Sequence, residues 1–362
     1  MNGENRNPLA QSAALPVDVV LHPSWWHENE GLCFDQDFFF NAKKRVECEQ
    51  RMERALYERW GEFGLGSDRE KRIPWVGAVH LAAGFLISEM LGCEVRYHEG
   101  SAPQVLCAHR ETLQIDIAEA FVSAAFKKLS GLCEDLKAEF GYVRGDVNWA
   151  GVLNVAMDIR GEQIFVDMFE KKEEVNELFS NLSRLLESFV SGIERETGSS
   201  SISVNRTVRH LAKPVFLHSE CSHTMISTQH YETYLLETDR AWSERHRPYG
   251  IHYCGEDAHR HICAFTQIPH LDFLDVGWGG NIKQLRANLP TTFLNIRLSP
   301  VELIHNTCEQ IRETIRDLVA DSANPSLTGV CCINIDHQVE DRKITTILET
   351  VRELRDQLQK CN

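Results

Sequence analysis

Short apolar runs alternate with amphipathic helical segments over the second half of the chain, and this alternation constrains the fold more than any other feature. The apolar runs cover residues 213–221, 249–256, 271–278, 291–299 and 329–336. Strands separated by helices pair in parallel, in a sheet that helices cover. The sequence contains neither a Gly-rich dinucleotide fingerprint nor a P-loop. We therefore predict the α/β class and, from five such units in a row, a (β/α)8 TIM barrel rather than a doubly wound sheet.

The first part of the chain does not show this alternation of apolar runs and helical segments. Residues 41–63 predict a charged helix, and residues 169–197 predict a long amphipathic one. Residues 147–159 predict a strand with its adjoining loop, and residues 1 to about 20 predict no regular element. We expect residues 1–75 to form an N-terminal helical and aromatic extension that packs on the barrel. Residues 76–362 would then form the barrel as a single structural unit.

Composition excludes several function classes. The 362 residues include 38 Lys and Arg against 53 Asp and Glu, a formal net charge of −15. This acidic balance argues against nucleic-acid binding and against adhesion to an anionic membrane surface. The apolar stretches are far shorter than the roughly 18 residues of a membrane span. The N-terminus has no secretory pattern, so we expect a cytoplasmic protein whose twelve cysteines are mostly reduced.

The strongest candidate for a chemical site is the sequence His252-Tyr253-Cys254, at the end of one apolar run. Alternate residues of a strand face the same side, so the imidazole and the thiol can converge on one point. Cys331 or Cys332, on the last apolar run, offers a third ligand, and only one of the two can face inward. One histidine and two thiolates would leave one position open on a tetrahedral Zn²⁺, the catalytic pattern. Packing of these residues inside the barrel is the alternative.

Other polar residues also fall at predicted strand ends, where barrel enzymes carry their chemistry. His218 and Glu220 follow one run, and Asp336 follows another. We predict proton-handling or ligand-orienting roles for Glu220 and Asp336, and a substrate hydrogen bond for His218. A hydrogen-bond network at the strand ends is the alternative interpretation of His218 and Glu220.

The N-terminal region is rich in aromatic residues, including Trp25, Trp26 and His27. These side chains could cover the barrel mouth and contact substrate, or they could form a satellite hydrophobic cluster. We add Asn148, Tyr253 and Trp278 to the predicted substrate contacts.

Five segments of the chain resemble the uroporphyrinogen decarboxylase superfamily, over roughly residues 145–360. They are GDVNWAGVLNVAMDIRGEQIFVDMFEKKEEVNELF, FLHSECSHTMISTQHYETYLL, GIHYCGEDAHRHI, LDFLDVGWGGNIKQLRANLP and CCINIDHQVEDRKITTILETV. The superfamily holds cofactor-free decarboxylases and zinc-dependent methyltransferases that work with a corrinoid protein, both on (β/α)8 barrels. His252 and Cys254 match the His-x-Cys zinc ligands of the methyltransferases. Cys331 matches their late cysteine, with Cys332 one residue out of register. The Arg-rich segment of the decarboxylases has no counterpart here.

The resemblance implies a zinc-dependent methyltransferase that moves a methyl group between a corrinoid protein and a small thiol or methylated compound. Methylcobalamin would be supplied by that separate partner protein, and a homodimer is an expectation from the family. The alternatives are a decarboxylase and a non-catalytic barrel that binds a corrinoid or tetrapyrrole. Bound zinc would favour methyl transfer, and clustered inward arginines would favour decarboxylation.

Overall fold

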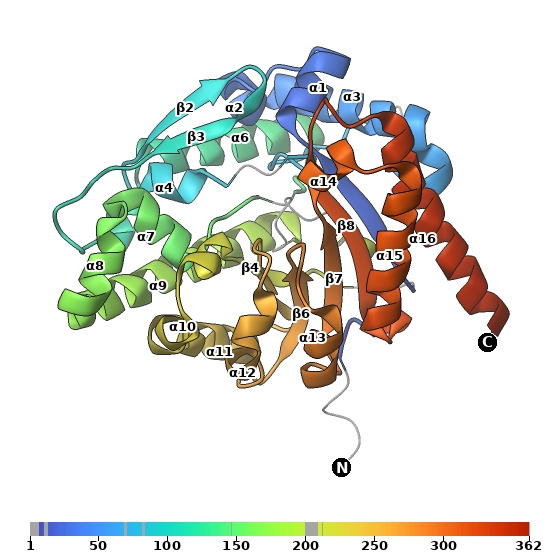
Figure 1. Ribbon diagram of the computed structural model, residues 1–362. Coiled ribbons are helices and arrows are strands. Elements are labelled where there is room, and N and C mark those ends of the chain that lie inside the picture. The colour runs from blue at the N-terminus through green and yellow to red at the C-terminus, as the bar shows by residue number, and fades with distance from the viewer. Residues whose placement is uncertain are drawn as a thin grey trace.

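The centre of the molecule is a six-stranded parallel sheet in the order β1-β8-β7-β6-β5-β4 (Figure 1). The computed structural model describes residues 7–10, 14–68, 71–81, 84–145, 147–199, 209–211 and 213–361. The strands of the sheet are β1 (Val17–Leu21), β4 (Phe216–Ser219), β5 (Tyr249–His252), β6 (Leu271–Val276), β7 (Phe293–Leu298) and β8 (Thr328–Ile335). All six strands are almost entirely buried, as expected of a parallel sheet covered by helices.

The pairing of β1 with β8 shows that the sheet curls as a barrel does. The first and last strands of a barrel are neighbours, whereas a doubly wound sheet places its first strand in the interior. Beyond β4, the next position around the sheet is taken by chain that forms no strand. Gly151 N donates to Ser219 O at the end of β4, and Trp75 forms an isolated parallel bridge with Arg144. The predicted α/β barrel class is therefore confirmed, as a curled half-barrel of six strands in the described part of the chain.

Helices surround this half-barrel (Figure 1). The α-helices are α1 (Pro23–Glu30), α2 (Gln36–Phe40), α3 (Ala42–Trp60), α4 (Leu86–Met90), α5 (Ile117–Ala120), α6 (Ala124–Phe140), α7 (Val152–Arg160), α8 (Gln163–Glu170), α9 (Lys172–Thr197), α10 (Thr228–Tyr234), α11 (Leu236–Arg245), α12 (Ile262–Phe265), α13 (Ile282–Asn288), α14 (Pro300–His305), α15 (Cys308–Ser322) and α16 (Asp341–Cys361). Short 3-10 helices are η1 (Gly61–Phe63), η3 (Cys221–Met225), η4 (Ala258–His261) and η5 (Pro325–Leu327). Among the described residues, none of these helices combines the length and apolarity needed to cross a membrane.

The N-terminal part supplies both a strand and a cover. The expectation of no regular element up to residue 20 is wrong from Val17 onward, because Val17–Leu21 forms β1 and pairs with β8. The edge strand β1 thus lies within residues 1–75, the range predicted to form an extension. α1, α2 and α3 follow, and an antiparallel hairpin of β2 (Glu94–His98) and β3 (Ser101–Leu106) lies near them (Figure 1).

One predicted strand is a helix. The sequence pattern of residues 147–159 predicts a strand, but Val152–Arg160 forms α7. Its buried residues Val152, Val155, Ala156 and Ile159 recur at the three- and four-residue spacing of a helix face. A short apolar run is ambiguous between strand and helix, and here the tertiary packing of that face selects the helix.

Candidate functional site

Two thiols and one imidazole converge at the C-terminal ends of β4 and β5. His252 ends β5, Cys254 follows two residues later, and Cys221 begins η3 just after β4. The Cys221 and Cys254 sulfurs are 2.7 Å apart, and Cys254 Sγ lies 2.8 Å from His252 Nε2. The three ligand atoms all lie within 4.8 Å of one another. The structure thus brings the predicted pair His252 and Cys254 together and adds Cys221.

A carboxylate orients the imidazole. His252 Nδ1 donates to Asp275 Oδ2 on the neighbouring strand β6, in register with His252. Asp275 Oδ1 in turn accepts a hydrogen bond of 3.1 Å from Asn295 Nδ2 on β7. Although burial alone lowers it, the negative charges of Cys254 and Asp275 raise the pKa of His252 to about 9. With Nδ1 held by the carboxylate, Nε2 is directed at the thiols, as in carboxylate–histidine–metal arrangements.

A hydrogen bond between the two thiols shifts their pKa values in opposite directions. The hydrogen bond from Cys221 holds the pKa of Cys254 well below its usual range, and the positive charge of His252 adds to this effect despite burial. The same hydrogen bond, together with burial, raises the pKa of Cys221. Of the two thiols, Cys254 is thus the one whose pKa is lowered, and the thiolate is the form that binds metal.

The loops that carry these ligands pack too closely for side chains. A Cβ at Gly277, after β6, would collide with the backbone oxygen of Gly255, which follows Cys254. A Cβ at Gly255 would meet the methyl group of Thr224 in η3. Glycine at both positions lets the loops after β4, β5 and β6 approach one another, so the cysteines from separate strands meet.

The group opens onto a cavity of about 210 Å³. The lining residues come from the ends of β4, β5, β7 and β8, from the chain before α4 and from the chain around α7. They are Gly84, Asn148, Trp149, Ala150, Asn154, Ser219, Cys221, His252, Cys254, Arg297, Ile333 and Asn334. All three members of the Cys221, His252 and Cys254 group are among them. A ligand in this cavity would therefore meet the thiols and the imidazole directly.

The donor set fits a metal ion. Two sulfurs and one imidazole nitrogen are the ligands that zinc takes, and three protein ligands beside a cavity leave the fourth position for substrate. The carboxylate behind His252 completes the usual outer support. Of the described residues, Cys221, His252 and Cys254 form the one group of at least three such ligands close enough to share an ion.

Cys331, the predicted third ligand, lies outside this group. It faces the barrel interior, in register with Arg297, and its thiol accepts from Asn295 Nδ2 at 3.1 Å. Cys332 faces the other way and lies 3.5 Å from Leu298 O. The prediction that only one of the two cysteines faces inward agrees with this geometry. Cys221 is not among the predicted ligands, although it directly follows Glu220 at a predicted strand end.

His218 and Glu220 form a closed network beside the site. His218 Nδ1 donates to Asp239 Oδ1 at 2.7 Å, and its Nε2 lies 3.6 Å from Glu220 Oε2. Glu220 accepts the backbone N–H groups of Leu153 and Asn154, at 2.7 and 3.2 Å, in the first turn of α7. Both side chains are fully buried. This arrangement matches the hydrogen-bond-network alternative more closely than proton transfer to a substrate.

The remaining predicted residues are dispersed. Asp336 accepts from Gln338 N at 2.8 Å in the turn after β8, and Tyr253 donates to Asp257. Asn148 lines the cavity, and its amide nitrogen donates to Leu81 O at 2.9 Å. Trp278 lies over the guanidinium of Arg297, which lines the cavity.

Trp25 and Trp26 of the N-terminal aromatic segment belong to the main hydrophobic core. Trp25 and Trp26 are buried edge to face, Trp25 packs near Trp60 of α3, and Trp26 packs near His80. His27 hydrogen-bonds to Leu32 O. The described residues that line the cavity do not include Trp25, Trp26 or His27. Trp25 and Trp26 therefore take part in core packing, and their cluster is continuous with the main core rather than a satellite of it.

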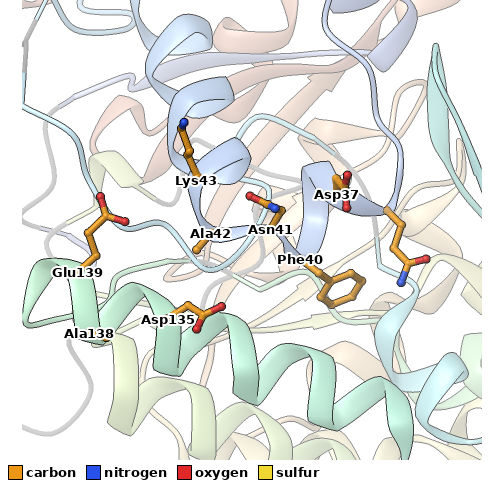
Figure 2. Close-up of a pocket in the computed structure, with 9 residues that line it drawn as sticks. Asp37, Phe40, Asn41, Ala42, Lys43, Asp135, Ala138 and Glu139 are labelled. Carbon is orange, nitrogen blue, oxygen red and sulfur yellow. The ribbon is translucent and has the colours of Figure 1, made fainter.

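A larger hollow, of about 490 Å³, lies away from the strand ends. It opens between the start of α3 and the C-terminal part of α6, with Lys43 on one side and Asp135 and Glu139 on the other (Figure 2). Its lining contains neither cysteine nor histidine. We assign it no role.

Comparison with solved structures places the fold. A methyltransferase from Methanosarcina mazei superposes with a TM-score of 0.65 at 12% identity, over 96% of each chain. A B12-independent methionine synthase from Shewanella sp. W3-18-1, in complex with selenomethionine, superposes with a TM-score of 0.51 at 9% identity, over 96% of this chain and 98% of that one. No family model and no curated protein sequence matches the chain. At these identities the likeness defines the class of fold, an α/β barrel.

Proposed function

We propose that this protein is a zinc-dependent methyltransferase that moves a methyl group between a corrinoid protein and a small thiol or methylated compound. The observation that carries the proposal is the group of Cys221, His252 and Cys254 at the C-terminal end of the barrel, open to a cavity. The fold likeness to a protein named as a methyltransferase and to a methionine synthase supports this reaction class.

Each residue of the group has a defined task in this proposal. A bound zinc ion would supply Lewis-acid activation, lowering the pKa of a substrate thiol so that it reacts as a thiolate. Cys221, His252 and Cys254 would hold the ion. Asp275 keeps His252 Nε2 directed at the ion's position. The cavity beside the group would receive the small substrate.

The proposal of a corrinoid partner protein is based on the sequence resemblance alone. Methionine synthesis without B12 occurs in a protein of similar fold, as its name states, so the fold alone does not require a corrinoid. We propose that the corrinoid protein docks at the mouth of the barrel, since the proposed metal ligands lie there. A homodimer and a cytoplasmic location also stay proposals from sequence.

The decarboxylase alternative is less well supported. A decarboxylase of this superfamily predicts several arginines that point into the site. The described residues that line the cavity include one arginine, Arg297. The cavity of about 210 Å³ also falls below the roughly 300–1,000 Å³ typical of sites for drug-sized ligands. A tetrapyrrole is larger still than such ligands, so the site suits a small substrate better.

Metal content of the purified protein tests the proposal. We expect about one zinc per chain in the anaerobically purified wild type, and its loss in Cys254→Ser. Cys263→Ser, which changes an exposed thiol, is the matched control and should keep the metal. Wild type without zinc would contradict the proposal. Zinc-loaded protein should then transfer methyl from methylcobalamin to a thiol.

The same measurement decides the third ligand. From the geometry we expect Cys221→Ser to lose zinc and Cys331→Ser to keep it. The opposite pattern would favour the ligand set implied by the family resemblance.

A further inference from the structure

Arg297 carries a buried charge with unused hydrogen-bond donors. It lies on β7 with 4% of its surface exposed, and its Nε and Nη1 atoms have no hydrogen-bond partner. Its guanidinium carbon lies 5.4 Å from the centre of the Trp278 ring, which helps to fix its position. Buried donors without partners are rare in folded proteins and call for an explanation such as a missing ligand.

The unused donors belong to residues that line the cavity beside the proposed metal ligands. A second lining residue, Trp149, also has a buried indole Nε1 without a partner. The lining contains Arg297 and three asparagines, and no Asp or Glu occurs among its described residues. The amide nitrogens of Asn148 and Asn154 already donate to Leu81 O and Ser219 O. The cavity therefore has unpaired donors and no carboxylate among its described lining residues, and the thiol of low pKa that also lines it, Cys254, is a proposed zinc ligand.

Arg297 keeps its positive charge in the buried site, because a guanidinium stays protonated in proteins. The two unpaired donors therefore sit on a permanent cation, and hydrogen bonds from such a cation favour an anionic oxygen.

We infer that Arg297 is a specificity-determining residue that binds the carboxylate of a small acid, while the reacting atom of that acid faces Cys221, His252 and Cys254. The position of the reacting atom rests on the proposed function; the anion-binding role of Arg297 does not. The cavity volume of about 210 Å³ limits the acid to a small molecule.

Calorimetric binding of two matched thiols tests the inference. Zinc-loaded wild type should bind 3-mercaptopropionate about 10- to 100-fold more tightly than 3-mercaptopropanol, which lacks the charge. Arg297→Met should bind both thiols equally, and Arg297→Lys, which keeps the charge, should recover part of the preference. Arg316→Met, on the exposed face of α15, is the control and should behave as wild type.

The outcomes separate this inference from the proposed function. If zinc-loaded wild type binds the two thiols equally, the inference on Arg297 is overturned and the zinc proposal stands. If the protein holds no zinc, the proposed function fails, and propionate, which has no sulfur, becomes the probe for the metal-free protein. Propionate binding that disappears in Arg297→Met, with Arg297→Lys as the folded alternative, would then support the anion site, and no binding would overturn it.

Discussion

Two carboxylate–histidine pairs stand side by side at the ends of β4 and β5, and they differ in what lies beyond the imidazole. His218 on β4 is held by Asp239 of α11, and His252 on β5 is held by Asp275 of β6. Beyond His218 lies Glu220, whose oxygens cap the first turn of α7. Beyond His252 lie Cys254 and Cys221, which face a cavity. The pair of His218 and Asp239 is fully buried within the protein, whereas His252 of the second pair lines the cavity.

An oriented histidine is not by itself a functional site. The charges around both imidazoles raise their pKa to about 9, in each case against the effect of burial. A perturbed pKa therefore does not separate the two pairs. What separates them is access, since only an imidazole whose free nitrogen faces other ligands and a cavity can hold an ion or meet substrate.

The largest expected effect comes from breaking the closed pair. Asp239 accepts hydrogen bonds from Tyr231 and Tyr249 as well as from His218. Asp239→Asn should lower the free energy of unfolding by about 3–5 kcal/mol, because it removes a buried carboxylate to which His218 and both tyrosines donate. Urea unfolding measures the loss, and zinc content per folded chain should stay unchanged. Loss of zinc with unchanged stability would reverse the roles that we give to the two pairs.

The matching substitution in the open pair should act on the metal instead. Asp275→Asn weakens the support of His252, and we expect zinc affinity to fall by about 10- to 100-fold. Competition with a chelator of known affinity measures this change, and Asp239→Asn serves as its control. Unchanged affinity in Asp275→Asn would show that His252 does not bind the metal through Nε2.

The smallest expected effect is a pH dependence of the closed pair. The pKa of His218 is raised from its ordinary value of 6.5 to about 9 in the folded chain. Its contribution to stability is therefore complete below pH 6.5 and is lost as the pH rises through 9. The stability difference between wild type and His218→Gln should narrow over that interval, by roughly 1–3 kcal/mol. A constant difference between pH 6 and 10 would show that His218 is not charged in the folded protein.

The candidate site was predictable in part. The spacing His252-x-Cys254 indicated the pair, because side-chain alternation on a strand is a local property. Cys221 was missed, since its approach to Cys254 depends on how the loops after β4 and β5 pack around Gly255 and Gly277. Arg297 was missed as well, because the pattern of β7 shows a strand but not which of its polar residues lacks a partner.

The fold was predictable to a similar degree. Each apolar run of the second half became a strand, because a run buried on both faces of a parallel sheet is apolar along its length. The first strand, Val17–Leu21, was missed, as its partner β8 lies about three hundred residues away in sequence. Trp25 and Trp26 pack with α3 into the main hydrophobic core, rather than into the satellite cluster offered as an alternative.

The sequence by itself determined the α/β class, the order of the strands from β4 to β8 and the His-x-Cys pair. These features follow from hydrophobic periodicity and from side-chain alternation along one strand, which are short-range properties. Tertiary structure alone decided that β1 closes against β8, that Cys221 joins His252 and Cys254, and that Glu220 caps α7 while Arg297 faces the cavity. Those outcomes depend on contacts between residues far apart in the chain, where loop packing and burial set which polar groups are satisfied and which stay open to a ligand.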